Sequence, residues 1–240
     1  MAQTLVLLHG FSGTHRAWDR VSAHLDEGRY RPLALDLPGH GDSAQPGGPI
    51  TFEGSVEAVL AASPERFALC GYSLGGRVAQ HVALAAPERV SRLVLVSTTS
   101  GIEDAQERAE RRASDGRLAD ELEQLPFEDF IERWRTQSLF ADDPPEVDEL
   151  ARQDQRRNDP HALAQAMRGL GTGEMASLWD RLGELSMPVT IVVGERDTKF
   201  RTLGARMMAR IPLAEMVVIP GGHGLPIENP SGLAHLIDRL

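Results

Sequence analysis

Short apolar runs rich in leucine and β-branched residues recur along the chain, and segments with helical spacing of apolar residues lie between most of them. The apolar runs are residues 4–8, 31–35, 67–70, 92–96, 188–193 and 216–219. The helix-spaced segments are residues 17–25, 52–62, 77–86, 202–210 and 232–240. Alternation of buried strands with helices is typical of a parallel sheet with right-handed crossovers. The pattern therefore predicts an α/β fold, with a mostly parallel sheet flanked by helices.

One long interval lacks any strand-like run. From residue 103 to about residue 185 the sequence is charged and helix-prone, and Pro126, Pro160 and Gly169 interrupt it. We interpret this interval as an inserted helical cap. The sequence predicts a core made of residues 1–100 and 186–240, with residues 101–185 as the cap. A chain of 240 residues is long enough to bury the core of such a domain.

Negative charge is concentrated in the predicted cap. The net charge of the chain is −10, and residues 103–157 hold nine arginines against 17 acidic residues. Most of these charges are expected on the solvated outer faces of helices. An acidic chain without a basic stripe disfavours nucleic acid and anionic membranes as partners. We expect neither, and we expect a small molecule as the ligand.

The sequence gives no sign of a targeting segment or a membrane span. Residues 1–8 lack the features of a signal peptide, and no apolar run reaches transmembrane length. The single cysteine, Cys70, cannot form an internal disulfide, and its place at the end of an apolar run indicates buried packing. We expect a cytoplasmic protein that is a monomer or a weak homo-oligomer.

The pentapeptide Gly71-Tyr72-Ser73-Leu74-Gly75 joins a predicted strand to a predicted helix. This order of strand, tight turn and helix is that of a nucleophile elbow. Its glycines let the strand and the helix approach closely and hold the serine at a strained backbone position. Because the helix begins at the serine, its free N–H groups face any negative charge that develops on a bound substrate.

Two further polar residues follow late strands of the predicted sheet. Asp197 comes after the run at 188–193, and His223 lies in a glycine-flanked loop after the run at 216–219. In parallel sheets the catalytic groups gather at the carboxyl ends of the strands, and the order Ser73, Asp197, His223 is that of α/β-hydrolases. A serine needs an imidazole within reach and a carboxylate that orients it. Weaker alternatives are Asp36 or Glu195 for the carboxylate, and His40 or His81 for the imidazole.

The loop after the first apolar run reads His9-Gly10-Phe11. It can direct the backbone N–H of Phe11 at the same point as the N–H of Leu74. Together these two donors would form an oxyanion hole. For His9 itself we favour a structural role in shaping the loop over a catalytic one.

Several motifs carry a resemblance to a known family. The generic ones, His9-Gly10-Phe11-Ser12-Gly13, Asp36-Leu37-Pro38-Gly39-His40-Gly41, Gly71 to Gly76 and Gly222-His223, resemble the α/β-hydrolase superfamily over nearly the whole chain. More specific motifs resemble the 2-succinyl-6-hydroxy-2,4-cyclohexadiene-1-carboxylate synthases of menaquinone biosynthesis. These are Gly75-Gly76-Arg77, Ala105-Gln106-Glu107-Arg108-Ala109-Glu110-Arg111, Trp134 with Phe140, Gly169-Leu170-Gly171-Thr172-Gly173, Ser177-Leu178-Trp179 and Gly194-Glu195-Arg196-Asp197-Thr198-Lys199-Phe200.

This resemblance implies a carbon–oxygen lyase that needs no cofactor and no metal ion. In the family, the triad removes a proton beside an activating carbonyl, and the resulting anion expels pyruvate from an enolpyruvyl ether. The resemblance makes Ser73, activated by His223, the base, and makes Asp197 the residue that orients His223. It also places Arg77, Arg111 and Lys199 on the carboxylates of the substrate. Tyr72, Trp134 and Phe140 would line the pocket.

The cationic residues also have a physical argument of their own. A substrate with several carboxylates needs cations in a partly desolvated cleft, and arginine binds carboxylates as a bidentate fork. Lys199 is the only lysine of the chain, beside 24 arginines, and follows the candidate acid Asp197 closely. For Arg111 the residues alone leave the choice open, because Arg108 and Arg112 share its helix. Trp134 and Phe140 could equally be core residues of the cap.

Two other functions fit the same residues, and one position departs from the family. A serine carboxylesterase would use the same triad through an acyl-enzyme, on a small acidic ester. A non-catalytic binding protein on this scaffold is weakened because every catalytic position is filled. The family commonly carries a second histidine after the catalytic one, where this chain has Pro226. The pocket near His223 is therefore expected to differ in shape.

Overall fold

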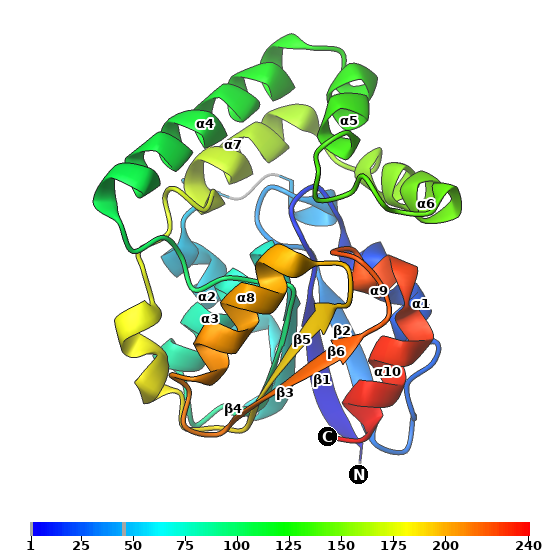
Figure 1. Cartoon of the computed structure of the whole chain (residues 1–240), viewed down its shortest axis with the longest axis vertical. Helices are drawn as coiled ribbons and strands as arrows, with labels where there is room; N and C mark the ends of the chain where they lie inside the picture. Colours follow the sequence, from blue (N-terminus) through cyan, green and yellow to red (C-terminus); the bar gives the residue numbers. More distant parts are fainter. Residues whose placement is uncertain (1, 45–46) are drawn as a thin grey trace.

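The computed structural model describes residues 2–44 and 47–240; Met1, Gln45 and Pro46 lie outside the described residues. Those residues form a six-stranded parallel sheet in the order β2-β1-β3-β4-β5-β6, drawn as arrows in Figure 1. The strands are β1 (Gln3–Leu8), β2 (Tyr30–Leu35), β3 (Phe67–Tyr72), β4 (Val90–Val96), β5 (Val189–Gly194) and β6 (Ala214–Ile219). The α/β-hydrolase fold expected from the sequence is therefore confirmed.

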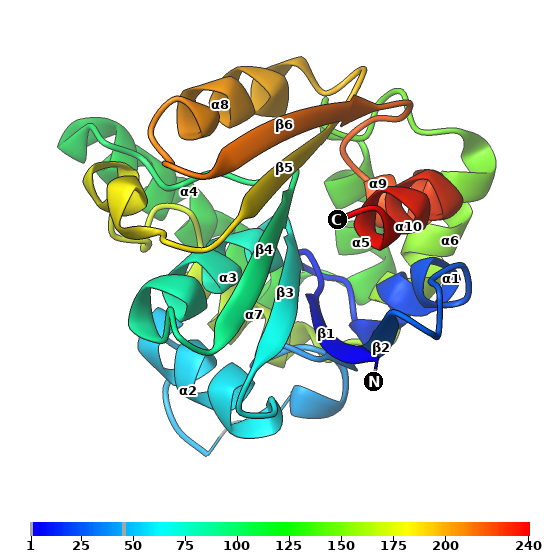
Figure 2. The same cartoon turned by 90° about the horizontal axis from the view of Figure 1, so that it is seen from below.

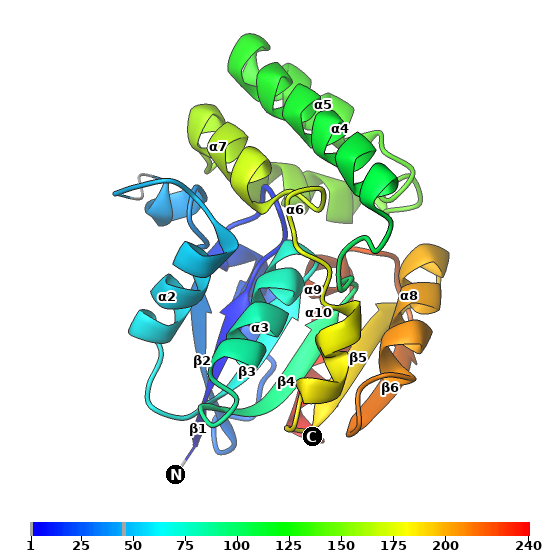
Figure 3. The ribbon, with the colours of Figure 1, turned by 90° about the vertical axis from the view of Figure 1, so that its left-hand side faces the viewer.

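Helices cover both faces of the sheet. One face carries α2 (Phe52–Ala62), α3 (Leu74–Ala85) and α8 (Thr198–Met208), and the other carries α1 (Asp19–Ser22), α9 (Leu225–Glu228) and α10 (Pro230–Asp238). Figure 2 shows the two layers with the sheet between them, and Figure 3 shows α2 and α3 in front of the strands. Each face has its own buried apolar cluster, one around Leu69 and Val78 and the other around Trp18 and Leu233.

The structure corrects the sequence-based elements in two respects. The strands β2 and β6 lie at the edges of the sheet and are only partly buried, whereas the sequence predicted strands buried on both faces. The helix predicted over 202–210 begins already at Thr198, because the side chain of Asp197 accepts a hydrogen bond from the backbone N–H of Phe200 and caps the helix. This hydrogen bond at the start of α8 fixes the position of Asp197 after the end of β5.

Four helices between β4 and β5 lie together over the carboxyl ends of the strands (Figures 1 and 3). In the described chain they are α4 (Ala105–Gln124), α5 (Phe127–Arg135), α6 (Pro145–Gln155) and α7 (Pro160–Leu170). Leu122, Phe130 and Leu163 belong to a separate apolar cluster between α4, α5 and α7. The last part of the predicted cap lies elsewhere, since Leu178, Trp179 and Leu182 pack into the core cluster around α3. This segment lies beside the sheet because its apolar side chains are buried in the core there.

Within the part of the chain that the structure describes, no helix combines the length and the apolar character needed to cross a membrane.

Candidate active site

Ser73 lies at the turn between β3 and α3, where it is the N-cap residue of the helix. Its φ of 52° and ψ of −108° are a conformation that L-residues rarely adopt. Close packing around the turn enforces it. A Cβ at Gly71 would overlap the carbonyl of Gly75, and a Cβ at Gly75 would overlap the carbonyl of Leu8. The turn therefore has the geometry of a nucleophile elbow.

The side chains of Ser73, Asp197 and His223 meet above the ends of three strands. Nε2 of His223 lies 3.2 Å from Oγ of Ser73, and Nδ1 of His223 lies 2.8 Å from Oδ2 of Asp197. Since a carboxylate can only accept, Nδ1 carries the proton and Nε2 is free to accept the proton of the serine hydroxyl. The three residues that the sequence singled out are thus arranged as a catalytic triad.

Two of the four alternatives to the triad residues, Asp36 and His81, are engaged elsewhere. Asp36 lies 2.9 Å from Nδ1 of His15 and accepts hydrogen bonds from the backbone N–H groups of His15 and Asp42. Nδ1 of His81 donates to the carbonyl of Arg77, and its ring stacks on Phe52. These contacts hold Asp36 and His81 in structural positions, so neither competes for Ser73.

The loop after β1 and the start of α3 present two free N–H groups. Neither the N–H of Phe11 nor that of Leu74 donates a backbone hydrogen bond among the described residues. The N–H of Gly75 donates to the carbonyl of His9 at 2.9 Å, which holds the loop against the elbow. Both N–H groups are therefore available to a ligand, and their role as an oxyanion hole stays a prediction from the sequence.

His9 shapes this loop from inside the protein. Its ring is fully buried, Nδ1 donates to the carbonyl of Gly10 at 2.8 Å, and Nε2 accepts from the N–H of Leu37 at 3.0 Å. Burial lowers the pKa of His9 to about 4, so the ring is neutral near pH 7. This agrees with the structural role that the sequence favoured.

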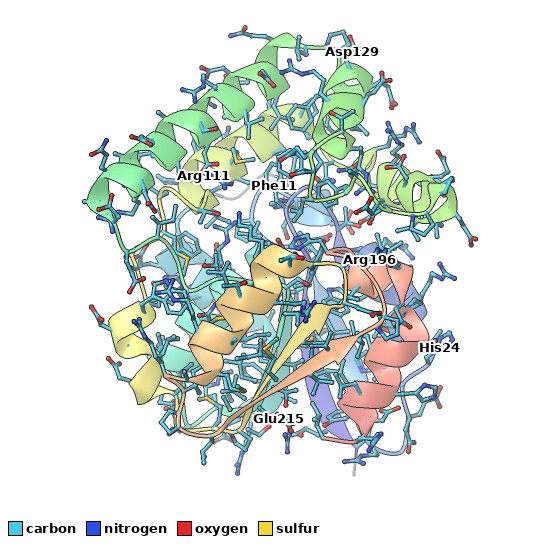
Figure 4. The ribbon with its side chains drawn as sticks, viewed as in Figure 1. Phe11, His24, Arg111, Asp129, Arg196 and Glu215 are labelled. Atoms are coloured by element: carbon cyan, nitrogen blue, oxygen red, sulfur yellow. The ribbon has the colours of Figure 1, made fainter. Side chains whose placement is uncertain are left out.

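A cavity of about 230 Å³, partly open to solvent, lies between the triad and the cap helices. We call this space the catalytic cavity. In Figure 4, Phe11 and Arg111 are labelled where the core and the cap face each other. Its walls contain Ser73, His223, the oxyanion candidate Phe11 and all six predicted substrate-binding residues, namely Tyr72, Arg77, Arg111, Trp134, Phe140 and Lys199. Residues to which the sequence assigned no role in the site also line it, among them Gln137, Ser138, Leu139, Met167, Thr172 and Phe200.

Three of the lining residues are cations from three different helices, and we call Arg77, Arg111 and Lys199 the cation cluster. Arg77 is buried, and its Nη1 donates to the carbonyl of Leu170 at 2.6 Å. Burial and the charge of Arg111 lower the pKa of Arg77, and the same two causes lower the pKa of Lys199. Burial and mutual repulsion disfavour the charged form of these side chains, and a bound anion offsets both effects. The cavity is therefore suited to a ligand with carboxylates.

Aromatic rings form the apolar part of the cavity wall. The ring of Trp134 lies 5.0 Å from that of Phe11 and 6.3 Å from that of Phe140. The ring of His223 lies 4.6 Å from Phe200, 5.3 Å from Tyr72 and 6.0 Å from Phe140. These contacts exclude water from one side of the imidazole and fix its plane.

Sequence reasoning missed the residue that supports Phe140. The guanidinium of Arg135 lies 4.4 Å above the ring of Phe140, and it forms ion pairs of 2.6 Å with Asp143 and Asp148. Arg135 and Asp143 are almost fully buried. Arg135 is one of 24 arginines, and only its place next to Trp134 could have drawn attention to it.

Pro226 lies buried in the first turn of α9 and does not line the catalytic cavity. It lines a second, smaller cavity, which shares Phe11, Tyr72, Trp134 and Phe140 with the first. The departure from the family at this position therefore lies in the wall of the second cavity and not in that of the catalytic cavity.

One group of described residues could hold a metal ion. Ligand atoms of His15, Asp36 and Asp42 all lie within 4.8 Å of one another. The carboxylate of Asp36 already accepts two backbone N–H groups and contacts the His15 ring. This group is satisfied by internal contacts and lies outside the catalytic cavity.

A parallel sheet with a serine elbow after β3, an acid after β5 and a histidine after β6 defines an α/β-hydrolase. The sequence profile of the alpha/beta hydrolase family matches residues 5–236. The chain belongs to this family. Among the alpha/beta hydrolases, it belongs with the 2-succinyl-6-hydroxy-2,4-cyclohexadiene-1-carboxylate synthases.

Similar proteins support that placement. The synthase of that name from Salmonella schwarzengrund is 34% identical over 246 residues, which cover 100% of this chain and 94% of the relative. The structure of MenH from S. aureus superimposes with a TM-score of 0.91 at 32% identity, covering 98% of this chain and 91% of that chain. A malate-bound thermophilic esterase from Thermogutta terrifontis gives a TM-score of 0.83 at 26% identity, covering 100% and 89%.

Proposed function

We propose that this protein is a carbon–oxygen lyase of menaquinone biosynthesis. Its substrate would be 2-succinyl-5-enolpyruvyl-6-hydroxy-3-cyclohexene-1-carboxylate, and its products 2-succinyl-6-hydroxy-2,4-cyclohexadiene-1-carboxylate and pyruvate. Membership of the synthase family supports the reaction. The observation that carries the proposal is the cation cluster beside the triad in one cavity.

The reaction is an elimination that consumes no water. A base takes the proton from ring carbon 2, beside the succinyl carbonyl, and the electron pair left behind forms the double bond between carbons 2 and 3. The existing double bond between carbons 3 and 4 shifts to carbons 4 and 5, and the carbon–oxygen bond from carbon 5 to the enolpyruvyl group breaks. Enolpyruvate leaves with that electron pair and takes up a proton to become pyruvate. Negative charge develops on the activating carbonyl oxygen during the first step, so an oxyanion hole stabilises the transition state.

The triad geometry supplies the base. Nε2 of His223 can take the hydroxyl proton of Ser73, so that Oγ removes the proton from the substrate. Asp197 keeps His223 in the required tautomer and stabilises the imidazolium that forms. The N–H groups of Phe11 and Leu74 would hold the carbonyl oxygen on which charge develops.

The cation cluster would bind the carboxylates of the substrate. Three helices contribute one cation each: Arg77 from α3, Arg111 from α4 and Lys199 from α8. Tyr72, Trp134 and Phe140 would pack against the ring. We propose a small polycarboxylate as the partner of this site, whereas the cytoplasmic location and the monomeric or weakly oligomeric state stay predictions from the sequence.

The test is release of pyruvate from the enolpyruvyl precursor by the purified protein, followed with a coupled dehydrogenase. Ser73→Ala should lower the rate by at least about 10³-fold, because it removes the base. Ser97→Ala is the matched control, since Ser97 also has a positive φ at the end of a strand but lies outside the cavity. Full activity of Ser73→Ala would refute the proposed base.

A serine carboxylesterase for small acidic esters is the second candidate. The likeness to the Thermogutta terrifontis esterase favours it. In that reaction Oγ of Ser73 would attack the ester carbonyl and form an acyl-enzyme. Turnover of such an ester, with no pyruvate formed from the enolpyruvyl precursor, would favour the esterase over the lyase.

A further inference from the structure

A buried carboxylate on the cap lies directly behind the cation cluster. Asp115, on α4, is 2% exposed. Its Oδ1 accepts a hydrogen bond of 2.6 Å from Nε of Arg111, and its Oδ2 accepts one of 3.0 Å from the backbone N–H of Gly173. Asp115 therefore joins a cation of the cavity to the loop that follows α7.

Leu170, the last residue of α7, lies directly before that loop and contacts a second arginine, Arg77. The carbonyl of Leu170 accepts the hydrogen bond from Arg77, and Gly171 and Thr172 line the catalytic cavity. The loop lies tightly against α4, since a Cβ at Gly171 would lie 2.6 Å from Oδ2 of Asp115. Asp115 thus contacts Arg111 directly and reaches Arg77 through the loop.

The contact leaves the binding groups of Arg111 available. Within the described chain Arg111 uses only its Nε in a hydrogen bond, so both Nη groups can donate to a ligand. The side chain is 38% exposed and lines the catalytic cavity. A guanidinium that is held by Nε presents its two Nη groups in a fixed plane, which suits a carboxylate.

We propose that Asp115 is a positioning residue of the substrate site, which orients Arg111 and fixes the Leu170–Gly173 loop so that Arg77 and Arg111 grip one polycarboxylate. The proposal rests on the proposed function, because it takes the cation cluster as the substrate site. It differs from it in assigning a role to a residue that does not line the cavity. Asp115 acts on binding and has no part in the proton transfer.

The test compares Asp115→Asn with Asp120→Asn. Asparagine keeps an oxygen that accepts from Gly173 but loses the charged pair with Arg111. We expect KM for the enolpyruvyl precursor to rise about tenfold to a hundredfold with kcat nearly unchanged. Asp120 is on the same helix, exposed, and paired with Arg168 away from the cavity, so Asp120→Asn should leave both constants unchanged. An unchanged KM, or a fall in kcat alone, for Asp115→Asn would overturn the proposal.

A second measurement separates this inference from the proposed function. Calorimetric binding of citrate, a tricarboxylate, reports the cation cluster without any lyase step, and Asp115→Asn should raise its Kd by a similar factor. Weakened citrate binding in a protein that releases no pyruvate would leave the role of Asp115 standing and refute the lyase. Failure of the unaltered protein to bind citrate, in a protein that does release pyruvate, would overturn the role of Asp115 and leave the lyase reaction standing.

A third variant covers the case in which Asp115→Asn does not fold. Arg111→Lys leaves the bond from Gly173 to Asp115 intact but removes the Nε contact and the planar fork. It should raise KM and the citrate Kd to the same extent as the asparagine variant. Citrate binding equal to that of the unaltered protein would overturn the proposal.

Discussion

Nη1 of Arg77 donates a hydrogen bond of 2.6 Å to the carbonyl oxygen of Leu170. Arg77 lies in the first turns of α3, the helix that begins after Ser73, and Leu170 is the last residue of α7 in the cap. The bond therefore connects the elbow helix of the core to the cap, and it fixes a cation near Ser73. Because Arg77 is 8% exposed, an unpaired guanidinium there would be costly.

The first prediction concerns this arginine. Arg77→Lys keeps the positive charge but loses the planar fork, so it cannot serve Leu170 and a carboxylate in the same geometry. We expect kcat/KM for the precursor to fall about tenfold to a hundredfold. Arg66→Lys, at an exposed position between α2 and β3, is the control. Equal activity of the two variants in the pyruvate assay would contradict a binding role for Arg77.

The second prediction concerns the carboxylate of the triad. Asp197→Asn should lower kcat about 10³- to 10⁴-fold, because the amide favours the wrong tautomer of His223. The asparagine oxygen can still accept from the N–H of Phe200, so α8 keeps its cap and thermal unfolding should be little changed. A measured kcat within tenfold of the unaltered protein would show that Asp197 is not the orienting acid.

Local sequence patterns were sufficient for the core and the triad. Ser73 is recognisable because the elbow needs a strand, small residues and a helix in direct succession, all within one short segment. Asp197 and His223 could be found because each follows a strand, and parallel strands bring their carboxyl ends to one edge. The side chains of Asp197 and His223 lie close to Ser73 because the parallel strands β3, β5 and β6 end at the same edge of the sheet.

The cap could not be predicted in the same detail. Along α4 few residues are apolar, and only Asp115, Ala119 and Leu122 of its described residues are buried. Such a helix gives no clear apolar stripe, so its sequence does not reveal which arginine faces the cavity. The structure places Arg111 in the cavity wall, whereas Arg112 pairs with Glu174 on the surface. The buried partners of Arg111 and Arg135 depend on packing between helices, which residue spacing does not show.

The third prediction compares two glycines. A Cβ at Gly75 would overlap the carbonyl of Leu8, so Gly75→Ala should lower the free energy of unfolding by about 2 kcal/mol or more. A Cβ at Gly116, inside α4, would meet no atom of another described side chain or segment within 4 Å, so Gly116→Ala should raise that free energy by about 0.5 to 1 kcal/mol. Urea unfolding of both variants measures the difference. Equal effects would mean that the elbow is not closely packed.

The fourth prediction concerns the pH dependence of the free energy of unfolding that two buried histidines cause. The rings of His9 and His40 lie 4.9 Å apart and are fully buried. Burial lowers the pKa of His9 to about 4 and that of His40 to about 3, from an ordinary value of 6.5. Nε2 of His40 has no hydrogen-bond partner among the described residues. Burial therefore outweighs the charge of Asp36 and the hydrogen bond to the carbonyl of Pro38, which favour the protonated ring.

The sign of the effect follows from proton binding. Between pH 6.5 and about 4 the unfolded chain binds more protons at these rings than the folded protein does, so stability falls as the pH falls. Each neutral buried ring contributes a slope of about 1.4 kcal/mol per pH unit in this window, and its contribution is complete above pH 6.5.

Urea unfolding at pH 7, 6 and 5 tests this assignment. His40→Gln removes one titrating ring, so the loss of unfolding free energy between pH 6 and pH 5 should shrink by about 1.4 kcal/mol even if the variant is less stable overall. His24→Gln replaces an exposed ring, labelled in Figure 4, and should leave the slope as it is. A slope that His40→Gln does not change would mean that His40 is protonated inside the folded protein. In that case the buried pair beside the oxyanion loop could not be neutral.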